Sequence, residues 1–213
     1  MIPVAETAAV ILAAGAGSRF GGGKIRAPLD GRPLLAHVLA AVREAGVGRV
    51  VVVLGRDAAA VLSAVRADEP AALDRVLVAM NPQPERGLAT SLAIGLGPAT
   101  AAPAPAGVLV VLGDQPRVRA EVLRALCDAV APASSVAVVP RYEADAAPNP
   151  VLLLPAGWPL VARLTGDRGL GPLLAANPDT VFRVPVRGAN PDVDTPADLA
   201  DLTAVPDQAA EPG

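Results

Sequence analysis

Short apolar runs rich in β-branched residues alternate with amphipathic segments along most of the chain. Seven runs have the length and composition of buried strands, and they cover residues 9–12, 50–54, 76–79, 108–112, 136–139, 151–153 and 181–184. Between them, apolar positions recur at helical spacing over residues 33–45, 58–67, 90–96, 119–131 and 170–176. This rhythm predicts successive βαβ units. We therefore expect a three-layer α/β fold in which helices flank a mainly parallel, Rossmann-like sheet.

The rhythm changes after Tyr142, where the segment YEADAAPNPVLLLPAGWPL carries four prolines. We expect this segment to pass over the open end of the sheet, where α/β proteins build their substrate loops. Residues 97–107 form an Ala/Pro connector with the composition of a plain surface loop. The residues after Leu202 contain too little apolar surface to pack. The prediction is one domain over residues 1–203 and a flexible tail over residues 204–213.

Length and composition narrow the class of protein. A chain of 213 residues suits one domain with a full core. Apolar residues make up 52% of it, but their longest runs are strand-sized, so no membrane-spanning segment is expected. Glu6 and the lack of a basic region before the first apolar stretch argue against a secretory signal, and a cytoplasmic location is expected. The one cysteine, Cys127, occupies an apolar helical position, which favours a buried, inert thiol over a disulfide or zinc ligand.

Charge and aromatic content limit the classes of molecule that the protein is expected to bind. A net charge of −3 and 2% aromatic residues provide neither a basic footprint for phosphate backbones nor rings for base stacking, so no nucleic-acid partner is expected. The one histidine, His37, stands beside the apolar stripe of the helix predicted over residues 33–45, and we expect it to be solvated. Any chemistry must therefore use carboxylates, lysine, arginine and backbone amides.

A glycine-rich loop, LAAGAGSRFGGGK over residues 12–24, follows the first predicted strand. Glycines let several backbone N–H groups turn toward one anion, so phosphate is the expected guest. A dinucleotide-binding fingerprint that starts at Gly15 fails, because residue 20 is phenylalanine. A P-loop that ends at Lys24 fails as well, because residues 18 and 25 are serine and isoleucine.

Two cations complete this loop. Arg19 offers a fork for pairs of oxygen atoms, and Lys24 offers a point charge on a flexible stem. Together they suit a chain of phosphates, which points to a nucleoside triphosphate. The alternative is a mobile loop whose cations are simply solvated.

Acidic residues stand at two further places in the pattern. Asp114 follows the strand predicted over residues 108–112, at the carboxyl end where open α/β sheets present their ligands. A carboxylate opposite a triphosphate becomes favourable when Mg²⁺ lies between them, whereas capping the next helix is the alternative role. The segment DVDTPADL adds Asp192 and Asp194 before a helix start, where Asp194 or Thr195 also fits the N-cap position.

Five motifs in this order carry a family resemblance: LAAGAGSRFGGGK, PLDGRPLLAHVL, NPQPERGLATSLAIGL, VLGDQP and DVDTPADL. They run from about residue 10 to residue 199, and the chain resembles the molybdenum cofactor NTP-transferase family, its cytidylyltransferases in particular. The resemblance implies the Rossmann-like nucleotidyltransferase fold. It also implies Mg²⁺-dependent transfer of CMP from CTP to the terminal phosphate of molybdenum-bound molybdopterin, with pyrophosphate released. A molybdoenzyme of the xanthine dehydrogenase type is the partner that it suggests.

The same resemblance assigns roles to residues of this chain. Lys24 and Arg19 are the expected catalytic residues, and Asp114 and Asp194 the expected metal ligands, with Asp194 preferred over Asp192 because it directly precedes Thr-Pro. The expected nucleotide-binding residues are Leu12, Ala13, Ala14, Gly15, Gly17, Ser18, Lys24, Asn81, Gly87, Thr90, Ser91 and Asp114. Within this set, Leu-Ala-Ala-Gly and Gly-Leu-Ala-Thr-Ser favour cytidine over guanosine.

The acceptor side departs from the family's pattern. Candidate acceptor contacts are Gln115, Tyr142, Asn149 and Asp167. However, Pro148 stands where relatives usually carry glycine, and isoleucine and arginine follow Lys24 where relatives carry leucines. A guanylyltransferase, a sugar-phosphate nucleotidyltransferase and a non-catalytic nucleotide-binding module that serves a molybdoenzyme therefore stay open as alternatives. An NAD-dependent oxidoreductase is disfavoured because the fingerprint spacing fails.

Overall fold

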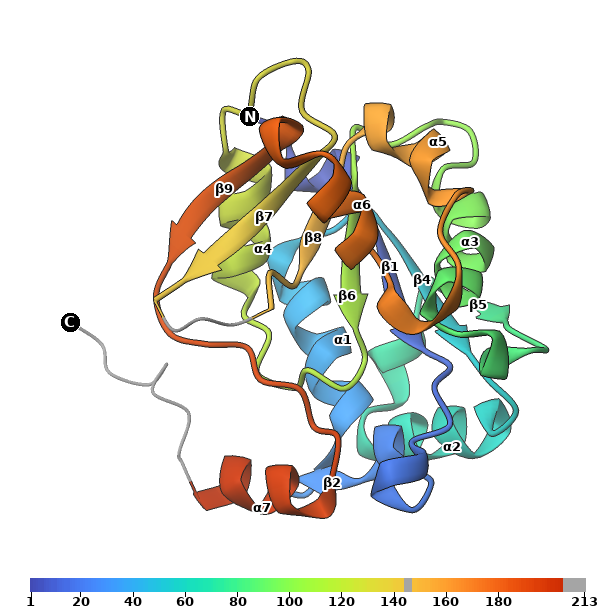
Figure 1. Cartoon of the computed structure of the whole chain (residues 1–213). Coiled ribbons are helices and arrows are strands. Elements are labelled where there is room, and N and C mark those ends of the chain that lie inside the picture. The colour runs from blue at the N-terminus through green and yellow to red at the C-terminus, as the bar shows by residue number, and fades with distance from the viewer. Residues whose placement is uncertain (144–146, 205–213) are drawn as a thin grey trace.

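A seven-stranded sheet forms the centre of the computed structural model, which describes residues 1–143 and 147–204 (Figure 1). Its strands are β1 (Ala8–Ala13), β4 (Arg49–Leu54), β5 (Val76–Met80), β6 (Val108–Leu112), β7 (Ala137–Tyr142), β8 (Val151–Leu153) and β9 (Val181–Val186). In space they run in the order β5-β4-β1-β6-β8-β7-β9. A separate small ladder pairs β2 (Pro28–Leu29) with β3 (Arg32–Pro33).

The prediction of a mainly parallel sheet is confirmed, with one exception. Strand β8 runs antiparallel to both of its neighbours, β6 and β7, whereas all other pairs in the sheet are parallel. The connection from β7 to β8 contains only residues 143–150. A parallel crossover needs a dozen or more residues. Because this connection is shorter, the chain returns in the opposite direction.

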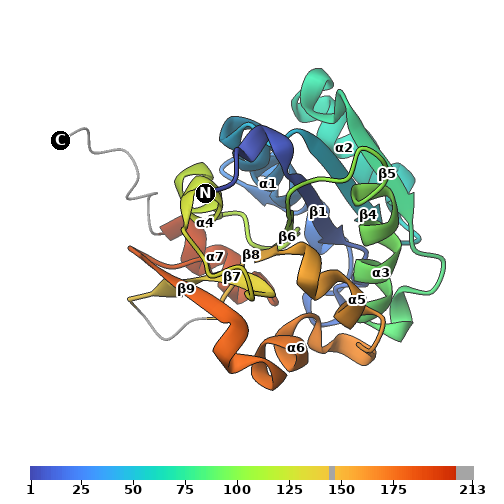
Figure 2. The same ribbon diagram turned by 90° about the horizontal axis from the view of Figure 1, so that it is seen from above.

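Helices cover both faces of this sheet, as expected for a three-layer fold (Figure 2). They are α1 (Leu34–Ala45), α2 (Ala58–Asp68), α3 (Leu88–Ala99), α4 (Ala120–Asp128), α5 (Trp158–Val161), α6 (Gly171–Ala176) and α7 (Pro196–Ala204). Helices α1, α2 and α4 lie on one face, and α3, α5 and α6 lie on the other. The apolar pattern predicts all of these helices except α5 and α7. Helix α5 is a single turn, and for α7 the sequence indicates only where the helix starts.

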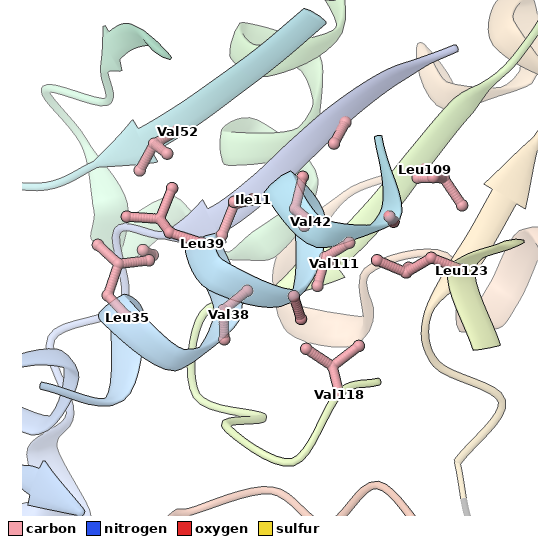
Figure 3. Packing of buried hydrophobic residues seen from close by; sticks show 14 of the residues in the cluster. Ile11, Leu35, Val38, Leu39, Val42, Val52, Leu109, Val111, Val118 and Leu123 are labelled. Carbon is pink, nitrogen blue, oxygen red and sulfur yellow. The ribbon is translucent and has the colours of Figure 1, made fainter. Parts of the chain in front are cut away.

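The alternation of side chains along β1 explains how one strand serves two cores. Ala9 and Ile11 face α1 and its neighbours, whereas Val10 and Leu12 face α3. All of β1 is buried, because a strand covered by helices on both faces must be apolar on both. On the first face, the apolar stripe of α1 packs onto Ile11 and Val111 (Figure 3). This packing holds the carboxyl ends of β1 and β6 side by side.

A small third cluster fixes the segment that follows β9. Buried Val193 packs with Leu29 and Leu34, and Leu199 and Leu202 of α7 close over them. Helix α7 thus docks on the β2-β3 ladder, beyond the carboxyl ends of the central strands (Figure 1). It extends through Ala204, where the flexible tail was predicted to begin, and residues 205–213 of that prediction lie outside the described residues.

Three smaller predictions meet mixed outcomes. Cys127 is buried, as expected, and burial, followed by the charge of Asp128, raises its pKa to about 11. His37 is only half-exposed rather than solvated, because its Nε2 lies 2.9 Å from the carbonyl oxygen of Leu29. The connector over residues 97–107 begins inside α3 and is held by Arg49, which donates to the carbonyls of Ala99 and Ala101.

Over the described residues, no helix combines the length and apolarity needed to cross a membrane.

Candidate active site

The glycine-rich loop leaves β1 at the point where the strand order reverses between β1 and β6. Chain connections diverge there, and in open α/β sheets such a point is where the ligand crevice forms, beyond the carboxyl ends of the two strands. Gly17 adopts a φ of +58°, and a Cβ on it would lie 2.9 Å from Cβ of Lys24. Only glycine lets the loop turn so closely over the stem of Lys24. The loop therefore folds back on itself and points Lys24 into the crevice.

Backbone donors line the outer side of this loop. The N–H groups of residues 15–19 make no hydrogen bond to any described residue. At Gly15 the backbone needs no left-handed conformation, and an added Cβ would meet no atom within 4 Å. The fold itself does not require glycine at this position. Its absence of a side chain keeps a run of free N–H donors accessible, which is the arrangement that binds phosphate oxygens.

Lys24 joins the loop to two carboxylates. Its Nζ lies 2.6 Å from Oδ2 of Asp114 and 3.1 Å from Oδ1 of Asp194, and its side chain is only 10% exposed. Arg19, at 76% exposure, reaches the other oxygen of Asp194 at 2.9 Å. Burial by itself lowers the pKa of Lys24, but the charges and hydrogen bonds of Asp114 and Asp194 outweigh it and raise the pKa above 10.5. Lys24 is therefore a buried ammonium group that carries its charge at neutral pH.

The sequence carries a signal for Lys24 that motif spacing does not use. Lys24 is the only lysine in the chain, whereas the other 17 basic residues are arginine. Arginine presents a wide planar fork, and lysine a compact charge that fits between two close carboxylates. A chain that otherwise uses arginine throughout thus keeps lysine at the one position where the compact ammonium is needed.

The two aspartates of the segment DVDTPADL point to different partners. The N–H of Val193 donates to the carbonyl of Asp114 at 3.0 Å, and Val193 points into the apolar cluster below. Asp194 on one side reaches Lys24, whereas Asp192 on the other accepts a 2.6 Å hydrogen bond from Nε2 of Gln115. Partial desolvation, followed by the charge of Asp114, raises the pKa of Asp192.

Capping of α7 does not use Asp194. Thr195 Oγ1 accepts a hydrogen bond from the N–H of Asp198, and the Asp198 carboxylate accepts from the N–H groups of Thr195 and Asp194. This is a reciprocal cap, and its backbone hydrogen bonds lower the pKa of Asp198. The carboxylate of Asp194 is therefore free for the crevice, and Thr195 serves as the N-cap.

The donor chemistry of the crevice fits a divalent metal. Asp114 and Asp194 already converge on one cationic centre, the ammonium group of Lys24. Mg²⁺ takes one or two carboxylates and completes its shell with phosphate oxygens and water. Within the described residues no group of three or more acidic, histidine or cysteine ligands gathers, so a metal here would need the phosphates as partners.

Two of the predicted nucleotide contacts have another task. Asn81 and Ser91 are 1% and 3% exposed, and Asn81 Nδ2 donates to Ser91 Oγ at 2.9 Å. Asn81 also accepts a hydrogen bond from the N–H of Gln83. Both side chains are buried and bonded to each other, and their contact with a nucleotide stays a prediction. They tie the loop before α3 to the helix that follows it.

The start of α3 contacts a loop that is distant in sequence. Gly87 has a φ of +95°, and a Cβ there would lie 2.4 Å from the backbone of Gly166. The Asp167 carboxylate accepts a hydrogen bond from the N–H of Leu88 at 3.3 Å. Asp167, predicted on the acceptor side, thus lies at the start of α3 and, within the described residues, makes no hydrogen bond to the other three acceptor candidates. Capping a helix satisfies its carboxylate locally.

The other acceptor candidates do come together, around a residue that sequence reasoning missed. Asn190 Nδ2 donates to Gln115 Oε1 at 2.9 Å and lies 3.4 Å from the carbonyl oxygen of Asn149. The Tyr142 hydroxyl donates to the same carbonyl at 2.7 Å. Asn190 stands two residues before Asp192, in the alternation that also places Asp194, and this spacing is the signal that would have found it.

An apolar cavity of about 190 Å³ opens between the acceptor side and α3. Leu12, Val110 and Leu112 form its floor at the ends of β1 and β6. Asn149 and Arg168 are polar residues at its walls. The cavity therefore lies between the start of α3 and the segment before β8, which carries Asn149.

A family comparison bears on what this crevice does. The model of the MobA-like NTP transferase domain matches residues 9–181, which include the glycine loop, Lys24 and Asp114. The chain belongs to the MobA-like NTP transferase family. The resemblance drawn from its motifs is thereby confirmed for the family, and this MobA-like domain is a nucleotidyltransferase domain.

Solved structures resemble this MobA-like domain over nearly its full length. Rv0371c from Mycobacterium tuberculosis H37Rv is 31% identical, with 93% of this chain and 97% of that chain covered and a TM-score of 0.81. A manganese complex of the same protein is 29% identical, with 93% and 98% covered and a TM-score of 0.76. A nucleotidyl transferase from Methanothermobacter thermautotroptrophicus is 25% identical, with 93% and 96% covered and a TM-score of 0.70. The manganese complex points to a divalent metal in this family.

Curated relatives are longer than this MobA-like domain. The bifunctional protein GlmU of Sinorhizobium fredii is 37% identical over 139 residues, which make up 64% of this chain and 29% of GlmU. The chain therefore spans less than a third of the length of that relative. This likeness therefore leaves the acceptor open.

Proposed function

We propose that this MobA-like domain transfers CMP from CTP to the terminal phosphate of molybdenum-bound molybdopterin and releases pyrophosphate. The observation that carries the transferase chemistry is Lys24, the only lysine of the chain, held between Asp114 and Asp194 beside a run of free backbone N–H groups. A site that only bound a nucleotide would not need two carboxylates beside the triphosphate loop.

The reaction needs positioning and charge neutralisation rather than a general base. An oxygen of the acceptor phosphate, already anionic near neutral pH, forms a bond to the α-phosphorus of CTP. The bond from that phosphorus to the oxygen shared with the β-phosphate breaks, and pyrophosphate leaves with the electron pair. Lys24 stabilises the charge that develops on the phosphate oxygens. The free N–H groups of residues 15–19 and Arg19 hold the leaving diphosphate.

Asp114 and Asp194 would hold a divalent metal, and Mg²⁺ is the ion proposed. When bound, such an ion neutralises phosphate charge and orients the triphosphate. Lys24 must then leave its place between the two carboxylates and move onto the phosphates. Its flexible stem, which lies under Gly17, allows that movement without a change in the loop.

The choice of base and acceptor rests on motif resemblance. Leu12, Ala13, Ala14 and Gly15 have the cytidylyltransferase form, and Ala13 and Ala14 are buried at the end of β1. These residues shape the edge of the crevice where a base would lie. The acceptor proposal follows from the same resemblance, and its product would serve a molybdoenzyme of the xanthine dehydrogenase type.

A transfer assay tests the proposal directly. Purified protein is incubated with Mg²⁺, each of the four α-³²P-labelled nucleoside triphosphates and either molybdenum cofactor or glucosamine 1-phosphate. We expect labelled dinucleotide product and pyrophosphate with CTP and molybdenum cofactor. Product with GTP alone would overturn the base assignment, product with the sugar phosphate alone would overturn the acceptor, and no product with any pair would overturn the transferase.

Lysine labelling tests the donor site without turnover. The only amines of the chain are the ε-amine of Lys24 and the amino terminus, so an amine-reactive ester modifies two sites that mass spectrometry separates. We expect Mg²⁺ and CTP together to protect Lys24 and to leave the amino terminus, the internal reference, unprotected. Equal labelling of Lys24 with and without CTP would contradict its contact with the triphosphate.

A further inference from the structure

A directional hydrogen-bond relay connects the acceptor side of the crevice to its carboxylates. Asp192, as a carboxylate, only accepts hydrogen bonds, so the group 2.6 Å from its Oδ1 must be the amide nitrogen of Gln115. Gln115 then turns its Oε1 toward Asn190, and Asn190 must answer with Nδ2 at 2.9 Å. One charge thus fixes the orientation of two buried amides.

The relay continues to the segment before β8. Asn190 Nδ2 also lies 3.4 Å from the carbonyl oxygen of Asn149, to which the Tyr142 hydroxyl donates. Gln115 Nε2 makes a second contact, 3.3 Å from the carbonyl of Asn190. Three of these side chains are nearly inaccessible to water, with exposures of 1% for Gln115, 5% for Asn190 and 8% for Tyr142. Buried amides in such a network hold their neighbours rigidly.

Asn190 carries an unusual cost for a residue with only a packing role. Its Oδ1 is buried and has no hydrogen-bond partner among the described residues. A buried acceptor without a partner is unfavourable, and an apolar residue of similar shape would avoid it. Asn190 instead uses its Nδ2 to donate a hydrogen bond to Gln115. We therefore infer that its role is to fix the direction of the hydrogen bonds in the relay.

We propose that Asn190 is a positioning residue for the acceptor substrate. Through Gln115 it holds Asp192 away from Lys24, so that Asp194 alone of that segment joins Asp114 at the metal. Through Asn149 it fixes the wall of the 190 Å³ cavity relative to those carboxylates. This arrangement positions the acceptor phosphate for attack on the α-phosphorus of the donor nucleotide. This role rests on the proposed nucleotidyl transfer, because it presupposes an acceptor beside Asn149.

Two substitutions of Asn190 separate orientation from packing. Asn190→Leu keeps the branched shape of the side chain and removes the relay, whereas Asn190→Asp presents an acceptor to Gln115 Oε1 and reverses it. We expect Asn190→Leu to raise the KM for molybdenum cofactor by about tenfold, with the KM for CTP within about twofold of wild type. Asn190→Asp should be worse, since Gln115 cannot satisfy two carboxylates. Ser135→Ala, a buried polar side chain at the other end of the sheet, is the matched control.

A swap of donor and acceptor provides the decisive readout. Gln115→Glu places two carboxylates against each other and should raise the acceptor KM more than tenfold. Adding Asp192→Asn restores a complementary pair, because the new amide donates to the new carboxylate, which still accepts from Asn190. We expect the double variant to recover most of the acceptor KM. Recovery of the acceptor KM, with the KM for CTP and the melting temperature unchanged between the single and double variants, is what a purely structural role would not produce.

The outcomes distinguish this inference from the proposed function. No transfer by the wild-type protein with any acceptor would overturn the function and the relay together. Transfer with an acceptor KM that Asn190→Leu leaves unchanged, in a variant whose melting temperature matches wild type, would overturn only the relay. If Asn190→Leu melts early, the swap decides the question, and its failure to rescue Gln115→Glu would overturn the positioning role.

Discussion

At the scale of single residues, the compact charge of Lys24 is the property on which turnover depends. Lys24→Arg keeps the charge, but a wide planar guanidinium cannot replace the compact ammonium group that, in the proposed reaction, leaves Asp114 and Asp194 and moves onto the phosphates. We expect kcat to fall by about 10²- to 10³-fold, the usual cost of losing one electrostatic stabiliser of the transition state. Steady-state kinetics with CTP and molybdenum cofactor measure the change.

Arg26→Lys is the matched control for this substitution. Arg26 is exposed in the same short turn, and its side chain makes no hydrogen bond to any described residue. Its exchange should leave kcat within about twofold, since an exposed charge away from the phosphates contributes little. If Lys24→Arg retained kcat as well as Arg26→Lys does, the role of a point charge at residue 24 would be wrong.

The single tyrosine of the chain makes burial of the acceptor side measurable. Burial raises the pKa of Tyr142 to about 12, although the charge of Arg119 and a hydrogen bond with Asn190 favour the ionised form. Its contribution to stability is fully present below the unfolded pKa of about 10 and is lost as the pH rises toward the folded pKa. Absorbance at 295 nm should show ionisation near pH 12 in the folded chain and near pH 10 in guanidinium.

The sequence predicted the charged residues at the centre of the site better than the polar residues around them. Arg19, Lys24 and Asp114 meet as expected, because their loops leave the carboxyl ends of the neighbouring strands β1 and β6, whereas the segment of Asp194 comes from the edge strand β9 and is held by the Val193–Asp114 backbone hydrogen bond. Asn81 and Ser91 were predicted to contact the nucleotide, but both are buried and pair with each other. Local sequence does not distinguish a polar residue that meets a ligand from one that braces a loop, because the distinction depends on which side the helix buries.

At the scale of elements, the glycine loop positions Lys24 through one close contact. Gly17→Ala must hold a left-handed φ and also brings its Cβ to 2.9 Å from Cβ of Lys24, whereas Gly21→Ala meets only the first difficulty. Both variants should lose about 1–2 kcal/mol of stability. Only Gly17→Ala should also lower kcat, by about 10- to 100-fold, because it displaces the catalytic side chain.

Thermal unfolding and kinetics of the two variants test this difference. Similar melting temperatures with a selective loss of kcat in Gly17→Ala support the contact. An equal loss of kcat in Gly21→Ala would instead mean that loop conformation in general, rather than the fit against Lys24, sets the rate. Lysine labelling should also become faster in Gly17→Ala, because the ε-amine becomes more exposed.

Long periodic elements were predictable from the sequence, and short ones were not. The apolar stripe of α1 and the buried strands β1, β4 and β6 set the layers without reference to anything distant. The direction of β8 depends on the length of a connection, and the β2-β3 ladder on tertiary contacts with α7 through Leu29 and Val193. Two-residue strands carry no periodicity of their own, so only the assembled fold defines them.

At the scale of the whole molecule, metal and nucleotide should stabilise the fold as one ligand. The triphosphate repels Asp114 and Asp194 without a cation between them, and the metal lacks most of its shell without the phosphates. At about 100 times the dissociation constant, Mg²⁺ and CTP together should stabilise the fold by about 2.7 kcal/mol. For a chain of this size that corresponds to a rise in Tm of roughly 5–10 °C. Each ligand alone should give a much smaller shift.

Paired aspartate variants assign this linkage to the correct carboxylate. Asp194→Asn should abolish the part of the Tm shift that requires Mg²⁺, because Asp194 reaches Lys24 and, by this proposal, the metal. Asp192→Asn should keep that part, since Gln115 holds its carboxylate on the acceptor side. The reverse pattern would show that Asp192 is the metal ligand, and an unchanged Mg²⁺ dependence in both would leave Asp114 as the only protein ligand. Because the two residues flank Val193 on a single short segment, this comparison changes the charge equally and the position by two residues only.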